Sequence, residues 1–532
     1  MTADRHVAVV GAGPAGLAAA HAALAAGARV TLIDSAEQPG GQYHRMLPEA
    51  YAAEHPGELQ HGWPAFEQRR RQVLTHQRCT WLPETSVWAL EHPDQHGKGA
   101  ERPDRARKRS VEAPPRLHLL CGGPVDGSGR TRRTLDADAL VLATGAHDRV
   151  LPFPGWQLPG VYSAGAAQAL AKGERVVVGD SVVVAGSGPF LLPVAASLLE
   201  AGSGVREVLE AGTPGTVARG WSGRPWELAS QLGKAAELKD CAAALARHRV
   251  PYQLGCAVVE ARGAGRVEEI VTARLRPDWS VVPGTERTVA VDALCVGHGF
   301  SPQLELPVAA GCALRGEQPG RGGSGEFVAV DDEQRTSVPG VFAAGEITGI
   351  AGAPAARAEG AVAGWTAAGG DPSVRPLRVL RRSRDQGRAF ARRLARAHPV
   401  GAGWPGWLRP DTVVCRCEET DYRALCEAFD SAADSAPRVT KLGTRAGLGP
   451  CQARICGPTV TELRDRLADR AAAGPAERPA EGLPAATPHR RPIAQPIRLG
   501  ELASPATALT DDEQHLTEGE QTRANSEQES DS

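Results

Sequence analysis

A glycine-rich segment near the beginning of the chain constrains its fold more than any other feature. Residues 6–34 read HVAVVGAGPAGLAAAHAALAAGARVTLID, in which Gly11, Gly13 and Gly16 form a G-x-G-x-x-G pattern. The segment predicts a strand, a tight turn and an Ala-rich helix, followed by a second strand that ends at Asp34. In such a βαβ unit the helix N-terminus faces the phosphates of a dinucleotide, and the carboxylate binds ribose hydroxyls. We therefore expect a dinucleotide site formed by Gly11, Gly13, Pro14, Ala15, Gly16 and Asp34.

A second segment repeats this pattern with one departure. Residues 180–211 read DSVVVAGSGPFLLPVAASLLEAGSGVREVLEA, and Leu191 stands where the third glycine is expected after Gly186 and Gly188. The helix and the strand should therefore pack less closely than in the first unit. Glu210 ends the second strand, and a carboxylate there favours NAD, since it would repel the 2′-phosphate of NADP. Two interpretations stay open: a site that binds NAD, and a domain that has kept its shape but lost its ligand.

Three further segments resemble the FAD site of the two-dinucleotide-domain flavoproteins. They are PGGQ at 39–42, LVLATGA at 140–146 and TSVPGVFAAGEITG at 336–349. The resemblance implies an α/β fold with two Rossmann-like domains, in which the FAD-binding domain is split around an NAD-type domain. It also implies that FAD binds at the first site and is contacted by Gly41, Gln42, Thr144, Gly145, Gly345 and Glu346. The family more often has Asp at the position of Glu346.

Disulfide reductases of this family carry a redox-active cysteine pair beside the flavin, and no such pair is recognisable in this sequence. Cys79 is the first cysteine and stands alone, while Cys241, Cys256 and Cys295 are too far apart for a C-x-x-C motif. We therefore expect no dithiol chemistry at the flavin. The sequence also reveals no acid–base pair, so catalytic residues stay unassigned. Hydride transfer between a nicotinamide and a flavin does not require such a pair, because the cofactors carry the chemistry.

Four of the eleven cysteines lie in two tight pairs near the C-terminus. Cys415, Cys417, Cys451 and Cys456 form the pattern C-x-C-x33-C-x4-C. Four thiolates are the usual ligands of a [2Fe–2S] cluster, and the glycines before Cys451 would let backbone N–H groups approach its sulfurs. Structural zinc is the main alternative, although its ligands are typically spaced C-x2–4-C, and an empty or degenerate site is another. Cys426 lies in a predicted helix and is expected to pack in the core.

The segments around these cysteines carry a second resemblance. VVCRCEET at 413–420 and TRAGLGPCQARICGP at 444–458 are similar to the bacterioferritin-associated-ferredoxin type of [2Fe–2S] domain. Together with the flavoprotein body, the chain resembles the flavin-containing large subunits of hydrogen cyanide synthase, opine oxidases, hydroxyproline dehydrogenases and the related sarcosine oxidase α subunits. This resemblance implies an electron-transfer oxidoreductase with FAD and a [2Fe–2S] cluster. The implied partners are a second flavoprotein subunit, which oxidises an amine or amino acid, and a small ferredoxin-like subunit.

Two other functions stay open at this point. One is a self-contained NAD(P)H-dependent reductase of a small acceptor or ferredoxin. The other is an assembly subunit that carries cofactors without turnover. The substrate and the final electron acceptor cannot be read from the sequence.

Net charge, apolar runs and the N-terminal segment indicate which classes of protein are not expected. The net charge is −2, so global charge gives no reason to expect nucleic-acid binding. No apolar run approaches the ~18 residues of a membrane span, and a strand rather than a signal peptide begins at His6. We therefore expect a cytoplasmic protein without a membrane span. In that compartment cysteines more often bind metals or act in catalysis than form disulfides.

These features divide the chain into six predicted parts. They are the first part of the FAD-binding domain at 1–150, an NAD(P)-binding-like domain at 151–299, the second part of the FAD-binding domain at 300–370, an Arg-rich helical linker at 371–410, a small α-rich [2Fe–2S]-binding domain at 411–468, and a mostly disordered tail at 469–532.

Three polar segments need separate interpretation. Residues 97–112 read as a solvated insertion. Residues 375–396 contain nine arginines and one acid, which indicates either a solvated helix between two domains or a docking face for an acidic partner. Residues 511–532 carry eight acids and one arginine and are not expected to fold alone. Within the tail, RPIAQPIRLGELA at 491–503 is a candidate to pack on the body or on a partner.

Overall fold

The computed structural model describes most of the chain. The described residues are 5–58, 60–92, 113–123, 129–223, 232–316, 326–431, 437–472, 491 and 493–509. The predicted insertion at 97–112 and the acidic end at 511–532 lie outside these ranges. No helix in the described part of the chain is long and apolar enough to cross a membrane.

The first dinucleotide domain is built on a five-stranded parallel sheet. Its strand order is β20 (Val341–Ala343), β7 (Ala139–Leu142), β1 (His6–Val10), β2 (Arg29–Ile33) and β3 (Cys79–Leu82). Every residue of β1 is buried, because other layers cover both faces of the sheet. Since β20 comes from far along the chain, the domain is split, which confirms the expected arrangement.

Small residues bring two helices close together on one face of this sheet. That face is covered by α1 (Pro14–Ala25), α2 (Trp63–Leu74) and α8 (Ala353–Ala367). A Cβ atom at Gly360 or Gly364 of α8 would lie 1.9 or 2.0 Å from the carbonyl oxygen of Ala15 or Ala19. The Ala-rich sequence of α1 and these glycines therefore fix the position of α8 against the first helix of the dinucleotide unit.

A second, smaller sheet covers the opposite face. It comprises β4 (Ser86–Glu91), β5 (Arg116–Cys121), β6 (Thr131–Leu135) and β23 (Thr507–Ala508), with α7 (Glu305–Ala309) packed beside it. β23 belongs to the C-terminal segment and follows α13 (Leu499–Ala503). The buried ion pair of Arg130 and Glu501, at 2.8 Å, anchors this segment. The stretch at 491–503 thus packs on the body.

The second dinucleotide domain repeats the parallel sheet. Its strand order is β12 (Tyr252–Leu254), β11 (Val205–Glu210), β10 (Val182–Gly186), β16 (Ala293–Gly297) and β9 (Val161–Ser163). One face carries α3 (Ala164–Gly173), α4 (Leu191–Glu200) and α6 (Leu232–Arg247). The other face carries the antiparallel strands β13 (Cys256–Arg262), β14 (Glu269–Arg274) and β15 (Arg287–Ala290). The paired strands β8 (Ala146–Asp148) and β17 (Phe300–Pro302) join the two domains. The α/β fold with two Rossmann-like domains is therefore confirmed.

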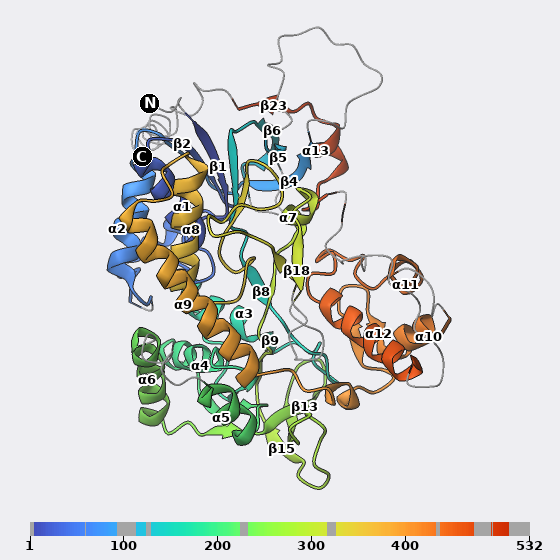
Figure 1. The fold of residues 1–532 in the computed structure, drawn as a ribbon. Coiled ribbons are helices and arrows are strands. Elements are labelled where there is room, and N and C mark those ends of the chain that lie inside the picture. Colours follow the sequence, from blue (N-terminus) through green and yellow to red (C-terminus); the bar gives the residue numbers. More distant parts are fainter. Residues whose placement is uncertain are drawn as a thin grey trace, which may run out of the picture.

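The four cysteines of the C-terminal pattern lie in a small lobe, on the right in Figure 1. Its elements are η3 (Trp404–Trp407), β21 (Val413–Cys415), β22 (Thr420–Asp421), α10 (Tyr422–Ser431), α11 (Pro437–Thr444) and α12 (Gly457–Ala472). The lobe shares a hydrophobic core with the second domain, where the rings of Trp279 and Trp407 stack with centroids 5.9 Å apart. The indole N–H of Trp156 also donates to the carbonyl of Val413 at 2.5 Å.

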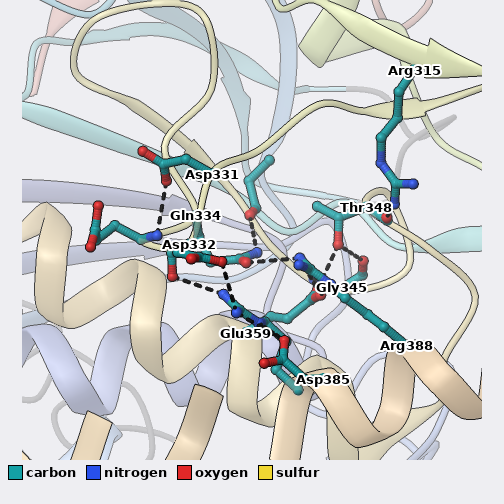
Figure 2. Close-up of polar contacts among 12 residues, drawn as sticks. Arg315, Asp331, Asp332, Gln334, Gly345, Thr348, Glu359, Asp385 and Arg388 are labelled. Carbon is teal, nitrogen blue, oxygen red and sulfur yellow. Dashed lines mark hydrogen bonds and ion pairs between the residues drawn. The ribbon is translucent and has the colours of Figure 1, made fainter. Parts of the chain in front are cut away.

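The arginine-rich segment forms one long helix, α9 (Arg375–Ala397), which runs from the first domain toward the second (Figure 1). One face of α9 is packed on α8, and its C-terminal part is packed on α5 (Pro214–Ser222). Figure 2 shows Arg388 pointing toward Glu359, which lies on α8. The side chain of Arg384 is 3% exposed and is paired with Asp332. The expectation of a solvated linker is therefore wrong for this face of the helix, because its arginines pair with acids of the body.

Candidate cofactor sites

The first glycine turn has no room for side chains at two of its positions. Gly11 has φ +100°, and a Cβ atom there would lie 2.3 Å from the carbonyl oxygen of Ala143. A Cβ atom at Gly16 would lie 1.7 Å from the carbonyl oxygen of Gly11. These contacts hold α1 against the carboxyl ends of β1 and β7. The third glycine is therefore required by the close approach of helix and turn.

The remaining glycine of the turn has a different role. A Cβ atom at Gly13 would have no neighbour nearer than 3.8 Å, the Cα atom of Gly41. Pro14 and Ala15 form the first turn of α1, and no side chain caps this helix. Two facing glycines and an uncapped helix N-terminus leave backbone N–H groups open to a ligand. Such a cradle fits the pyrophosphate of a dinucleotide.

Asp34 lies at the end of β2, beside this turn. Its carboxylate accepts hydrogen bonds from the N–H groups of Ala12 at 2.5 Å and Ala36 at 2.9 Å. Burial raises the pKa of Asp34, while these backbone donors lower it. The residue as a whole is partly exposed, so Asp34 is less enclosed than a core side chain. Its place fits the predicted role of binding ribose.

The later segments meet α1 at the same edge of the first sheet. Gly145, at φ +75°, follows Thr144, whose hydroxyl donates to the carbonyl of Gln303 at 2.9 Å. A Cβ atom at Gly345 would lie 2.9 Å from the Cβ atom of Ala15, in the first turn of α1. Sequence segments more than 300 residues apart thus converge on one edge of the first sheet.

Two predicted contact residues have other partners in the structure. The side chain of Glu346 accepts a hydrogen bond from the N–H of Gly352 at 2.9 Å, at the N-terminus of α8. The carbonyl oxygen of the Gln42 side chain accepts two hydrogen bonds from Arg45, at 2.9 and 2.6 Å. These bonds use one carboxylate oxygen of Glu346 and the amide oxygen of Gln42, so they do not by themselves prevent either side chain from contacting FAD.

Sequence reasoning missed one buried carboxylate in this region. Glu359 accepts hydrogen bonds from the N–H of Gly345 at 2.9 Å and from the hydroxyl of Thr348 at 2.6 Å. Arg388 of α9 donates to its other oxygen at 3.0 Å, as Figure 2 shows. The available signal was the single acid of α8, whose other residues are mostly small and apolar. Glu359 holds the Gly345 turn in place and ties α9 to it.

The second glycine turn resembles the first only in part. A Cβ atom at Gly186 would lie 1.7 Å from the carbonyl oxygen of Gly297, whereas Gly188 has φ +101° and no close neighbour. Helix α4 begins only at Leu191, three residues past Gly188, whereas α1 begins directly after Gly13. Because Leu191 cannot approach the turn as Gly16 does, the chain makes an additional turn before α4 starts.

The carboxylate of this second unit is enclosed. Glu210 is 0% exposed and accepts hydrogen bonds from the N–H groups of Gly188 and Gly212, both at 2.8 Å. The hydroxyl of Tyr252 donates to it at 3.4 Å, and the ring of His398, just past α9, lies 3.4 Å away. In the structure Glu210 thus contacts the protein itself, and its contact with a ribose stays a prediction.

The C-terminal cysteines are brought together by tight turns. Cys415 and Cys456 form a hydrogen-bonded pair, which lowers the pKa of Cys415 to about 5, and Cys417 lies beside Cys451. Electrostatic interactions also connect the two pairs. No group of three or more His, Cys, Asp or Glu side chains in the described ranges is placed so that it could hold a metal ion. None of the eleven cysteines forms a disulfide, and Cys426 lies on α10, outside the two pairs.

The backbone around these cysteines fits a sulfur-rich cluster. The N–H of Gly447 points to the sulfur of Cys415 at 3.5 Å. A Cβ atom at Gly449 would lie 2.3 Å from the Cβ atom of Cys417. Gln452 and Ala453 are both left-handed, with φ of 51° and 66°. The N–H groups of Gln452 and Arg454 donate to the carbonyls of Gly449 and Cys451, at 2.8 and 3.1 Å, so these turns hold the loop between Cys451 and Cys456 in shape.

The comparisons with known proteins agree with this geometry. Residues 5–360 match the family model described as pyridine nucleotide-disulphide oxidoreductase. The chain is 31% identical to an opine oxidase subunit of Rhizobium meliloti, over 94% of this chain and 88% of that protein. It is 30% identical to hydrogen cyanide synthase subunit HcnB of Pseudomonas protegens, over 84% of this chain and 89% of that protein.

A solved structure supports the fold. The crystal structure of L-proline dehydrogenase from P. horikoshii aligns with a TM-score of 0.60 and 17% identity. The alignment covers 94% of this chain and 79% of that chain. With the family match over two thirds of its length, this chain belongs to the pyridine nucleotide-disulphide oxidoreductases and is an FAD-dependent oxidoreductase.

Proposed function

We propose that this chain is the electron-transfer subunit of a multi-subunit dehydrogenase or oxidase of amines or amino acids. It would bind FAD at the first dinucleotide site and a [2Fe–2S] cluster at Cys415, Cys417, Cys451 and Cys456. When bound, FAD accepts electrons in pairs and the cluster accepts them singly, so the two cofactors together supply a conversion between two-electron and one-electron transfer.

One observation carries this proposal: the cysteine lobe and the FAD-type site occur in one chain, and the lobe is packed on the second dinucleotide domain. The lobe contacts the second domain through the Trp279–Trp407 stack. It also contacts the connection between the domains through the buried pair of Arg149 and Glu462. This packing fixes the lobe relative to the flavoprotein body, as electron transfer between two bound cofactors requires.

The residues of the chain have separate tasks in this proposal. Gly13 and Gly41 leave the backbone open for the pyrophosphate, and Asp34 accepts hydrogen bonds from the ribose. The glycine turns before Cys451 direct N–H groups toward the sulfurs. The relatives are named as subunits of opine oxidase and hydrogen cyanide synthase. We therefore propose that a second flavoprotein subunit oxidises the C–N bond and that a small ferredoxin-like subunit completes the complex.

Metal and sulfide analysis of the purified chain tests the proposal. After anaerobic purification we expect about two irons and about two acid-labile sulfides per chain, because this is the content of one [2Fe–2S] cluster. Cys456→Ser should lose or distort the cluster and keep FAD, because the cysteine lies outside the flavin domain. Cys426→Ser is the matched control and should keep both. Stoichiometric zinc, or a normal cluster signal in Cys456→Ser, would contradict the proposal.

A further inference from the structure

Arg491 is a buried cation whose hydrogen-bond donors are not satisfied by the described residues. It comes from the C-terminal segment that returns to the body, and its side chain is 5% exposed. Its Nη2 atom lies 3.4 Å from Glu305 of α7. None of its three side-chain nitrogens has a hydrogen-bond acceptor among the described residues. Buried polar groups without partners are rare and costly, so this guanidinium calls for a further acceptor.

Glu305 does not neutralise Arg491, because a second arginine shares it. Arg454 lies between Cys451 and Cys456 in sequence and contacts Glu305 at 3.0 Å. Arg454 also donates to the carbonyl of Cys451 at 3.4 Å. Two guanidinium groups therefore face one carboxylate beside the cysteine loop, and one positive charge is left over.

The thiolates of the cysteines are negative groups that can balance this positive charge. Burial lowers the pKa of Arg491, while Glu305 and the sulfurs of Cys451 and Cys456 raise it. Burial and Arg491 lower the pKa of Lys441, and Cys456 raises it. The lobe thus places a second cation near the sulfur of Cys456.

We propose that Arg491 faces the cluster held by the four cysteines and raises its reduction potential. The inference rests on the proposed function. Reduction adds one electron, and therefore one negative charge, to the cluster. A buried positive charge stabilises the reduced form more than the oxidised form, and N–H donors to cluster sulfurs act in the same direction. In this proposal Arg491 acts only through its charge, since it exchanges neither electrons nor protons with the cluster.

A potentiometric titration of the full chain, followed by electron paramagnetic resonance, tests this role. Arg491→Gln should shift the reduction equilibrium of the cluster toward the oxidised form by roughly tenfold, which is about 59 mV for one electron. The midpoint of FAD, followed by absorbance in the same sample, should not move. Arg491→Lys keeps the charge and should restore most of the potential.

Arg445→Gln is the matched control. Arg445 lies near the cysteine loops and pairs with Glu418 at 2.7 Å, but it is 68% exposed. Solvent and salt screen its charge, so its removal should leave the potential unchanged.

The outcomes separate this inference from the function on which it rests. Wild-type protein without iron and sulfide would contradict the proposed function. An intact cluster with an unchanged potential in Arg491→Gln would overturn the role of Arg491. If that variant loses its cluster, Glu305→Gln provides the test. It removes the acid shared by Arg454 and Arg491, so more positive charge faces the cluster and the reduction potential should rise. No rise in Glu305→Gln would then reject the proposal.

Discussion

Asp34 and Glu210 stand at the same place in two βαβ units of this chain, yet their surroundings differ. Asp34 binds two backbone N–H groups and is half-buried. Glu210 is 0% exposed and binds two backbone N–H groups and the hydroxyl of Tyr252, with His398 beside it. One carboxylate is left partly open to a ligand, and the other is used to hold the protein together. The same place in the sequence pattern therefore does not give the two acids the same surroundings.

The third glycine position explains part of this difference. Gly16 lets α1 begin directly after the second glycine, with its N-terminus at the turn. With Leu191 at this position, α4 starts two residues later than α1 does relative to the second glycine, so the positive end of that helix lies farther from the turn. His398, just past α9, also contacts Glu210 at 3.4 Å. The presence of Leu191 instead of a glycine thus changes how well the turn is suited to phosphates.

The largest effect that we expect is the loss of FAD in Gly13→Val. Gly13 has φ −70°, which any residue adopts, and no neighbour lies within 3.8 Å of its added Cβ atom. The variant should fold, while its side chain blocks the pyrophosphate and weakens FAD binding by about 100-fold, or roughly 2.7 kcal/mol. Flavin content after gel filtration measures this effect.

Gly188→Asn, at the matching position of the second turn, is the control for that experiment. Asn tolerates a positive φ better than most residues. The variant should keep its FAD. Full flavin occupancy in Gly13→Val, or loss of flavin in Gly188→Asn alone, would reverse the assignment of the two sites.

The next effect concerns stability and separates the two carboxylates. Glu210→Ala should lower the free energy of unfolding of the flavin-free protein by about 1–3 kcal/mol for each buried donor left unpaired. Asp34→Ala should cost less, because water can reach the donors that it exposes, and should act mainly on FAD affinity. Urea unfolding of both flavin-free variants measures the difference. Equal losses of stability would mean that Asp34 is as structural as Glu210.

The smallest effect that we expect is a gain of nucleotide binding in His398→Ala. Removing the ring uncovers Glu210 and should raise NAD affinity several-fold, by roughly 1 kcal/mol. NADP should gain less, since Glu210 repels its 2′-phosphate. Calorimetric titration with both nucleotides checks this, with Arg396→Ala as a control on the exposed side of the same helix end. A preference for NADP would refute the argument from Glu210, and no binding of either would favour a domain without a ligand.

Local patterns in the sequence predicted both dinucleotide units, because their turns and helix starts depend on residues close together in the chain. The enclosure of Glu210 could not be predicted, since His398 lies 188 residues further on. The anchoring of α9 was missed for the same reason. Its arginines read as solvated, and their partners Asp332 and Glu359 become neighbours only in the folded chain. The cysteine spacing predicted a cluster, but it gave no information on Arg491 or Glu305.

Anaerobic photoreduction of the bound flavin tests the central claim most directly, namely that FAD passes electrons to the cluster. In the wild-type chain, illumination with EDTA as electron donor should produce the resonance signal of a reduced [2Fe–2S] cluster. Flavin-free Gly13→Val should show no signal under the same light, although dithionite should still reduce its cluster. A wild-type flavin that becomes fully reduced while a dithionite-reducible cluster stays oxidised would contradict the account.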